Sequence, residues 1–566
     1  MASIIKKKIK GQTYYYYVES RRIDGKPKLV NQKYLGTAEK LLERVLAGEA
    51  PLSEGVLHSE ETDFGAVALI YDIALRLGMT DMIDTILPKR KQGVSIGMYI
   101  LTAVINRAAN PTSKSALQEW YTHTCLPLIT GHKPSLFSAQ NFWNNTQITE
   151  EELQRIEEAV LRKMIEVYRI DTSHLVYDAT NFFTYIDTTQ KSELSKRGHC
   201  KHKRNDLRIV GLSLLISPEF AVPLLHETYP GNRPDTKEFP IMMERLKSKY
   251  EAITGTALDV TVTFDRGNNS EANIDLLESG DFKLHYVGGL RKNQATDLYE
   301  IDRNEYTPLN TELLKGHYAF RREMEVFGRN AVVVIVYNPE LEKGQLQGLL
   351  INRAKAEVKL QTLQQQLVRR ANGEITKGKK PTVESITAAV GRILSVEYMD
   401  DITRYEVIEK DGHIHLSFSF PEDLLEAVRL KHLGKTVLFT DRKDFTNEQI
   451  ITTYRSAWHI EAAFKQMKDT DHLSVRPMFH WTDDKIRVHI AICVLALRLC
   501  SLLVKELHDA GITISINQLI DELSRIKRVH TFIGDIKKPK KLESYTLGSP
   551  LAQRIEAIYN LKKRYS

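Results

Sequence analysis

The feature that most constrains the fold is an alternation of strand-like and helix-like segments between residues 172 and 290. Short apolar runs predict five strands, and helix-forming segments follow the third and the fourth of them. An order of three strands, a helix, a strand, a helix and a strand is typical of an α/β fold with a mixed central sheet. The first predicted strand lies in SHLVYDAT and ends at Asp178. The other four are residues 207–217, 221–229, 260–267 and 285–290.

The bulk properties indicate a multidomain protein of a reducing compartment. A length of 566 residues exceeds what one hydrophobic core supports, and the net charge of +7 is a mild excess for this length. Four scattered cysteines do not form a disulfide framework, and the sequence starts without an apolar secretory segment. The most apolar run, 490–497, ends at Arg498 and is too short to span a membrane, so we expect a buried helix and no membrane.

Basic and helical regions flank the predicted core. Residues 1–50 predict a basic β-hairpin that turns at Asp24-Gly25, suited either to DNA backbone contacts or to protection of a sheet edge. The next region predicts several short helices, which fit a helix-turn-helix DNA reader or any small helical domain. The predicted division is 1–50 (basic hairpin), 51–165 (helical DNA-binding region), 166–298 (first part of the core), 299–433 (β-rich insertion with a helical arm), 434–510 (second part of the core) and 511–566 (basic C-terminal region).

A segment at 454–468, YRSAWHIEAAFKQMK, predicts one helix because it is free of Pro and Gly and dense in good helix formers. Tyr454, Glu461 and Lys468 are spaced by seven, which is only about 20° short of two helical turns. A hydroxyl, a carboxylate and an amine are therefore expected along one stripe of this helix.

Three acidic residues could form a metal site. Asp178 and Asp265 are both predicted at strand ends, where open α/β sheets bind ligands, and Glu461 could join them from a nearby helix. Carboxylates so close ionise together only if a hard cation such as Mg²⁺ or Mn²⁺ neutralises them. Position alone does not distinguish such a site from ordinary surface carboxylates.

Several words of the sequence resemble bacterial insertion-sequence transposases of the DDE class. They are, in chain order, YDATNFFTY, YPGNRPDTKEF, FDRGNNSEANI, YVGGLRKNQ, the Tyr-x6-Glu-x6-Lys helix and HLSVRPMFHWTDDKIRVHIAICVLAL. More narrowly, they resemble the branch with a Tyr-Arg-Glu-Lys signature, the insertion-sequence-four superfamily. The gap of 196 residues between Asp265 and Glu461 leaves room for the inserted domain of that branch.

The resemblance implies a ribonuclease H-like core in which Asp178, Asp265 and Glu461 are the catalytic metal ligands, with Mg²⁺ or Mn²⁺, two ions, as the cofactor. It implies double-stranded DNA, both transposon ends and target, as the partner, and a homodimer in the synaptic complex. It also implies a bacterial protein of the cytoplasm, associated with the nucleoid. From the resemblance and local charge, the expected DNA-binding residues are Tyr454, Arg455, Lys465, Lys468, Lys201, Lys203, Arg204 and Arg266.

The sequence departs from this branch at two points. The signature places Arg three residues after the Tyr, and this chain has Ala457 there; Arg455 or Lys465 are the candidate substitutes. Relatives that form a DNA hairpin hold a flipped base with an aromatic residue, often Trp, in the insertion. This insertion contains no Trp, so the candidates for stacking are Tyr318, Phe320, Phe327 and Tyr337.

Other candidate sites are weaker. His199, Cys200 and His202 are too crowded for a zinc site and lack a second ligand pair. The stretch around them is read either as a basic loop beside the active site that contacts DNA or as a solvated run of charges. Asp206 and Asp235 could support the metal ligands from behind. The expected function is metal-dependent cleavage at element ends followed by 3′-hydroxyl transfer, with a non-catalytic DNA-binding regulator or a plain metal-dependent nuclease as the alternatives.

Overall fold

The computed structural model describes residues 2–9, 12–23, 26–46, 56–88, 93–187, 189–198, 204, 206–254, 259–280, 283–535 and 538–565. At its centre is a nine-stranded sheet in the order β10-β11-β12-β15-β9-β8-β5-β6-β7. β5, β8 and β9 pair in parallel, and the other neighbours are antiparallel, so the predicted mixed α/β sheet is confirmed. The strands are β5 (His174–Thr184), β6 (Arg208–Ser217), β7 (Val222–Pro230), β8 (Thr261–Phe264), β9 (His285–Gly289), β10 (Thr307–Pro308), β11 (Tyr318–Val326), β12 (Arg329–Tyr337) and β15 (Lys435–Thr440).

Helices cover both faces of this sheet. On one face, the ring of Phe239 in α9 (Glu238–Thr254) packs against Tyr177 at 5.1 Å and Phe264 at 4.9 Å. On the other face, Lys468 of α15 (Trp458–Lys468) donates to Thr180 Oγ1 at 2.5 Å. Since side chains alternate along a strand, Tyr177 and Thr180 must lie on opposite faces.

Two sequence predictions about the core were wrong. β5 does not end at Asp178 but continues to Thr184, because antiparallel pairing with β6 extends to the Thr184–Arg208 pair. β11 and β12, predicted to lie in the insertion at 299–433, belong to the central sheet, because β12 pairs with β15. Only the segment after β12 leaves the sheet.

The predicted single helix at 454–468 is divided. α14 (Asn447–Arg455) ends before Ser456, and α15 begins at Trp458. Ser456 Oγ donates to the Thr453 carbonyl at 2.6 Å, and i→i+3 backbone bonds replace the α-helical pattern at the join. Because Ser456 and Ala457 keep nearly helical dihedrals, the change is a tight turn within an almost continuous segment.

The N-terminal helical region packs on the core through the long helix α16 (Asp483–Asp509) and through α8 (Glu150–Tyr168), which contacts α9. α16 contacts α2, α4 and α8, and it also contacts β7 at the sheet edge. Of the described helices, α16 alone is long and apolar enough to cross a membrane, and 89% of its most apolar window is buried inside the protein, the arrangement of a core helix. The other helices of this region are α2 (Gly65–Arg76), α3 (Met79–Ile86), α4 (Ile96–Ala109), α5 (Leu117–Thr122), α6 (Leu126–Thr130), α7 (Ala139–Asn145) and α8 (Glu150–Tyr168).

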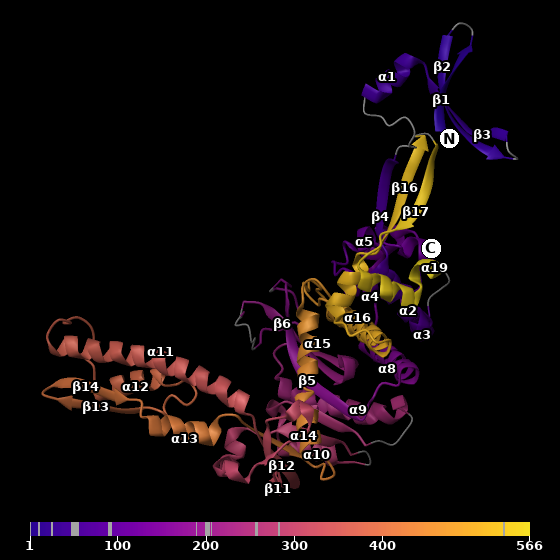
Figure 1. Ribbon diagram of the computed structural model, residues 1–566. Helices are drawn as coiled ribbons and strands as arrows, with labels where there is room; N and C mark the ends of the chain where they lie inside the picture. Colours follow the sequence, from indigo (N-terminus) through magenta and orange to yellow (C-terminus); the bar gives the residue numbers. More distant parts are fainter. Residues whose placement is uncertain are drawn as a thin grey trace.

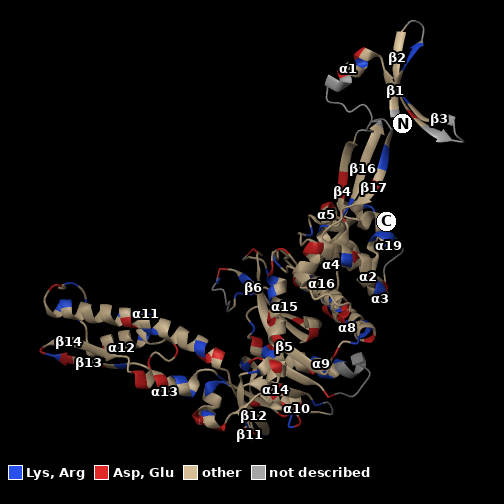
Figure 2. Ribbon diagram, viewed as in Figure 1, with Lys and Arg blue, Asp and Glu red and all other residues tan. Residues whose placement is uncertain are grey.

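Two further sheets extend from this helical region (Figure 1). β1 (Ala2–Ile9), β2 (Gln12–Ile23) and β3 (Lys26–Gly36) form a three-stranded sheet, with α1 (Ala38–Leu46) after it; the predicted turn residues Asp24 and Gly25 lie outside the described residues. β4 (Val56–Asp63) pairs with β16 (Lys527–Asp535), which pairs with β17 (Lys538–Tyr545). The basic C-terminal segment is therefore paired to the N-terminal region, with acidic side chains on β4 and basic ones on β17 (Figure 2). The C-terminal helices are α17 (Ile516–Ser524), α18 (Pro550–Tyr559) and α19 (Leu561–Tyr565).

Between β12 and β15 the chain forms an arm that projects from the sheet (Figure 1). Its longest helix, α11 (Pro339–Ala371), has 33 residues and a length of about 50 Å. The arm has a hydrophobic cluster of its own, separate from the main core, so it is a subdomain. Its other elements are α12 (Val383–Ile393), β13 (Arg404–Lys410), β14 (His413–Ser419) and α13 (Glu422–His432).

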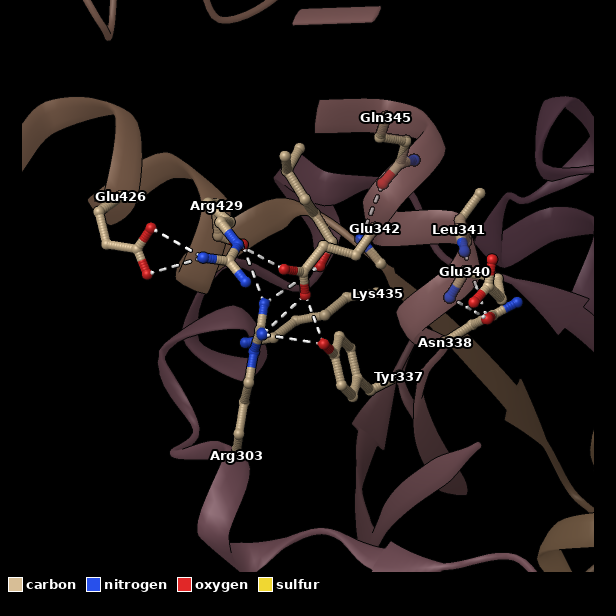
Figure 3. A network of polar contacts seen from close by, with 12 residues as sticks. Arg303, Tyr337, Asn338, Glu340, Leu341, Glu342, Gln345, Glu426, Arg429 and Lys435 are labelled. Atoms are coloured by element: carbon tan, nitrogen blue, oxygen red, sulfur yellow. Dashed lines mark hydrogen bonds and ion pairs between the residues drawn. The ribbon is translucent and has the colours of Figure 1, made fainter. Parts of the chain in front are cut away.

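A polar network fixes the arm to the sheet (Figure 3). Glu342, which is 4% exposed, accepts from Arg303 at 2.7 Å, from Arg429 at 2.5 Å and from the Tyr337 hydroxyl at 2.5 Å. These partners come from the segment before β10, from α13 and from β12. One carboxylate therefore joins the outgoing and returning ends of the arm to the central sheet.

We expect Glu342→Gln to destabilise the base of the arm by about 2 kcal/mol, because two arginines lose a charged acceptor. Hydrogen exchange of the α11 and α13 amides should become faster, while exchange in the central strands should not change. Glu357→Gln, at a half-buried position on the same helix without a described ion pair, is the control. Unchanged protection in α11 and α13 would contradict this role for Glu342.

Candidate active site

Asp178 and Asp265 lie side by side on neighbouring strands. β5 and β8 pair in parallel, and their last pair is Tyr177 with Phe264. In each strand the next residue is an aspartate. Asp178 and Asp265 therefore lie at the same position along the strand direction, about 4.8 Å apart between the two strands. Because Tyr177 and Phe264 face α9, both aspartates point to the opposite face, where α15 lies.

Glu461 is carried over this face by α15. Two contacts fix the segment along β5: Ser456 Oγ lies 3.3 Å from His174 Nε2, and Lys468 Nζ donates to Thr180 Oγ1. Glu461 lies between these contacts on the helix, as Asp178 lies between them on the strand. The carboxylate is exposed, and so is that of Asp265.

The side chain of Tyr454 lies near Asp265, Arg266 and Glu461. Its pKa is raised by burial; hydrogen bonding to Arg266 opposes this, and the carboxylates of Asp265 and Glu461 add to it. The phenol is thus within electrostatic reach of both carboxylates. Gly289, at the end of β9, allows the close approach: a Cβ there would lie 2.5 Å from the Tyr454 hydroxyl oxygen and 3.0 Å from Arg266 Nε.

The carboxylates suit a hard divalent cation by their chemistry. All three offer oxygen ligands on one face of the sheet, the type that Mg²⁺ and Mn²⁺ prefer. In the part of the chain that the structure describes, no three His, Cys, Asp or Glu side chains converge closely enough to hold a metal ion. Backbone N–H groups hold both aspartates: Oδ1 of Asp178 accepts from Ala179 and Oδ1 of Asp265 from Arg266, each at 2.7 Å.

A comparison with protein families identifies the core. Residues 169–499 match the model of the transposase DDE domain, which covers more than half of the chain. The chain belongs to this family. It is therefore a DDE transposase, and its mixed sheet is consistent with the ribonuclease H-like core expected from the sequence. DDE transposases generally use divalent metal ions.

A search of curated proteins gave no match. Among solved structures, the fold is similar to a piggyBac transposase in a synaptic complex with hairpin DNA, determined by cryo-electron microscopy. That similarity has a TM-score of 0.38 at 10% sequence identity, and it covers 83% of this chain and 82% of the other.

The predicted DNA-binding residues of the transposase fall into two groups. Arg266, Tyr454 and Lys468 line the face that carries the carboxylates, and Lys468 also lies 5.6 Å from the ring centre of Phe182. The others have no described contact with that face or are not described. Arg455 and Lys465 are exposed on α14 and α15, Arg204 is exposed and paired with Asp206, and Lys201 and Lys203 lie outside the described residues.

The arginine missing at position 457 has a counterpart elsewhere in the site. Neither predicted substitute, Arg455 or Lys465, has a described contact with Tyr454. The guanidinium beside Tyr454 comes instead from Arg266, directly after the second aspartate. The transposase therefore has an arginine at the site although position 457 is alanine.

Most of the secondary candidates do not support the metal ligands. Asp206 is exposed and bonded to Arg204, and Asp235 accepts from the Tyr229 hydroxyl at 2.8 Å. The zinc candidates His199, Cys200 and His202 lie outside the described residues. The four aromatic candidates belong to β11, β12 and the turn between them: Tyr318 is 38% exposed, Phe320 packs near Tyr306, Phe327 near Phe439, and the Tyr337 hydroxyl donates to Glu342.

Sequence reasoning missed the residues that fasten α14 and α15 to the sheet. His174 Nε2 lies 3.0 Å from Thr263 Oγ1 on the neighbouring strand and 3.3 Å from Ser456 Oγ. Sequence reasoning also missed the role of Gly289. The two adjacent glycines of YVGGL could have indicated that another group approaches the backbone closely there.

We expect Gly289→Ala to lower DNA cleavage by about 10- to 100-fold, because the new methyl group displaces Tyr454 and Arg266 from the carboxylates. DNA binding should change little, since no charge is removed. Gly344→Ala is the control, because a Cβ there meets no atom within 4 Å. The cleavage rates of both variants are measured side by side with the wild type. A wild-type rate for Gly289→Ala would refute the steric role of Gly289.

Proposed function

We propose that this transposase cleaves DNA at the ends of an insertion sequence and joins the freed 3′-hydroxyl to target DNA. The observation that carries the proposal is the placement of Asp178 and Asp265 at one level of two parallel strands, facing the helix of Glu461. Family membership supplies the reaction class.

In this proposal Asp178, Asp265 and Glu461 hold Mg²⁺ or Mn²⁺, two ions. When bound, the ions activate the attacking hydroxyl and stabilise the leaving oxygen of the phosphodiester. Tyr454 and Arg266 hold the scissile phosphate from the side of β9, and Lys468 holds it from the far end of α15. In the first step the oxygen of a water molecule bonds to phosphorus and the bond between phosphorus and the 3′ oxygen breaks, which leaves a 5′-phosphate and a 3′-hydroxyl. In the second step that hydroxyl gives its proton to solvent, its oxygen bonds to a target phosphorus, and the bond from that phosphorus to the target's own 3′ oxygen breaks.

The finer assignment rests on the sequence. The words around the three carboxylates and the arm between β12 and β15 support the Tyr-Arg-Glu-Lys branch and the insertion-sequence-four superfamily. We infer that the protein works on double-stranded DNA at the nucleoid, in the bacterial cytoplasm. Joining two element ends requires two active sites, so we infer a homodimer in the synaptic complex.

The test is a reaction of the purified protein with Mg²⁺ and a DNA fragment that carries both element ends. We expect cleavage at the ends and products joined to a target plasmid. Cleavage without joined products would favour a nuclease, and binding without cleavage would favour a regulator that has lost catalysis. Either result would overturn the proposal.

A further inference from the structure

Three large aromatic side chains are exposed together beyond the end of β5. They are Tyr185 (46% exposed), Phe479 (55%) and Trp481 (67%), and we call them the aromatic patch. The ring centres of Tyr185 and Phe479 are 5.5 Å apart, and the Tyr185 N–H donates to the Met478 carbonyl at 2.9 Å. His480 lies between the other two in sequence and stacks on the buried His489 at 4.4 Å, so Phe479 and Trp481 are turned outward.

A basic hollow adjoins this patch. It has a volume of about 590 Å³, and its charged lining consists of Lys191, Lys196, Arg197, Arg208 and a single acid, Glu193. The loop that forms it is bonded to Asp483, two residues after Trp481: Ser192 Oγ donates to Oδ1 at 2.5 Å, and the Glu193 N–H donates to Oδ2 at 2.8 Å. The patch and the hollow are therefore fixed side by side.

The same strand connects both features to the active site. From Asp178, the same face of β5 carries Thr180, where Lys468 binds, and then Thr184, whose hydroxyl lies 2.6 Å from that of Ser195 in the lining of the hollow. Tyr185 is the seventh residue after Asp178, which corresponds to about 23 Å of extended strand. A DNA strand with the 3.4 Å rise of a stacked duplex covers this distance in about seven nucleotides, and a more extended unpaired strand needs fewer.

We propose that the aromatic patch and the basic hollow bind an unpaired DNA strand that leads from the active site. Bases stack on the exposed rings, and phosphates lie in the hollow, the combination by which proteins hold single strands without reading sequence. Paired bases in a duplex are already stacked on each other, so the rings favour unpaired DNA. The inference rests on the proposed function, because it assumes that DNA occupies the site.

The experiment measures DNA affinity in the Asp178→Asn protein, which should not cut its ligand. A blunt duplex is compared with the same duplex carrying a single-stranded tail of about ten nucleotides, enough to reach the patch. The variants are Phe479→Ala with Trp481→Ala, and Lys196→Gln with Arg197→Gln. Tyr405→Ala, at an exposed aromatic residue of the arm, is the control. Thermal unfolding of every variant checks that it is folded.

We expect about tenfold tighter binding of the tailed duplex, lost in the aromatic variant and kept in the control. The aromatic variant should keep the salt dependence of tail binding, whereas the lysine–arginine variant should reduce its slope by about 0.7 per lost phosphate contact. Equal affinity for tailed and blunt DNA, or a preference that survives the aromatic variant, would overturn the proposal. A wild type that cleaves element ends but shows no tail preference would refute this inference alone.

Discussion

Replacing Asp178 by asparagine is expected to abolish DNA cleavage while DNA binding is retained. Asn has almost the same shape as Asp, but it removes one of the charged oxygen ligands that a divalent cation needs on this face of the sheet. We expect the cleavage rate to fall by about a thousandfold or more, as for other residues that act as a unit in a catalytic site. Binding should persist, because Arg266, Tyr454 and Lys468 remain.

Asp206→Asn is the matched control for this variant. It removes an aspartate that is exposed and paired with Arg204, so cleavage should stay near the wild-type rate. Gel assays of cleavage and binding with both proteins give the comparison. A fully active Asp178→Asn protein would remove Asp178 from the catalytic site.

Replacing Glu157 by glutamine is expected to cost about 4 kcal/mol of folding free energy, because it leaves a buried arginine without its counter-charge. Glu157 on α8 is 2% exposed and binds Arg498 of α16, which is 1% exposed. It also accepts from Arg245 of α9 at 2.7 Å and lies 2.5 Å from His226 Nδ1 on β7. The helical region and the catalytic core thus share one buried carboxylate.

The loss of folding free energy caused by Glu157→Gln should depend on pH. Burial raises the pKa of Glu157, but the charges of His226, Arg498 and Arg245 outweigh it and hold that pKa well below its ordinary value. A carboxyl whose pKa falls on folding stabilises the protein fully above its unfolded pKa and loses that contribution as the pH falls below it. The difference between wild type and Glu157→Gln should therefore be largest near neutral pH and shrink below about pH 4.

Chemical denaturation at several pH values measures this difference. Glu166→Gln on the same helix is the control, since Glu166 is 66% exposed and pairs only with Lys163 among the described ion pairs. Its effect should stay below about 1 kcal/mol at every pH. Equal effects of the two substitutions would show that the Glu157 cluster does not stabilise the protein.

Capping residues and the spacing of apolar residues predicted those helices and strands whose boundaries depend on their own sequence. Residues 339–371 form α11 at the bounds expected, because Asn338 caps a segment that starts with Pro339 and the helix formers end near Gly373. The order of β5 to β9 with α9 and α10 (Glu271–Glu278) also follows from apolar spacing. These features require no knowledge of distant partners.

Features set by distant partners were not predictable in this way. The extension of β5 depends on pairing with β6, and the place of β12 in the central sheet depends on β15, about 100 residues later in the chain. The turn at Ser456 depends on local hydrogen bonding that competes with the helix. The pairing of β4 with β16 joins segments at opposite ends of the chain, which no local signal announces.

The same division holds within the candidate site. Asp178, Asp265 and Glu461 were predicted because each lies in a distinctive word of the sequence. Arg266 as the partner of Tyr454, and Gly289 as the position that makes room for both, follow from the packing of β9 against α14. The absence of arginine at 457 was visible in the sequence, but the origin of the guanidinium beside Tyr454 was not.

We propose that carboxylates from β5, the end of β8 and α15 hold one metal centre. The most direct test is a titration with Mn²⁺ followed by electron paramagnetic resonance, with end DNA bound. Wild type is compared with Asp178→Asn, Asp265→Asn and Glu461→Gln. We predict Mn²⁺ binding by wild type that is weakened about tenfold or more in each variant, because each removes a ligand of the same centre. Wild-type affinity in Glu461→Gln would contradict the account, since the helix would then lie beside the metal without holding it.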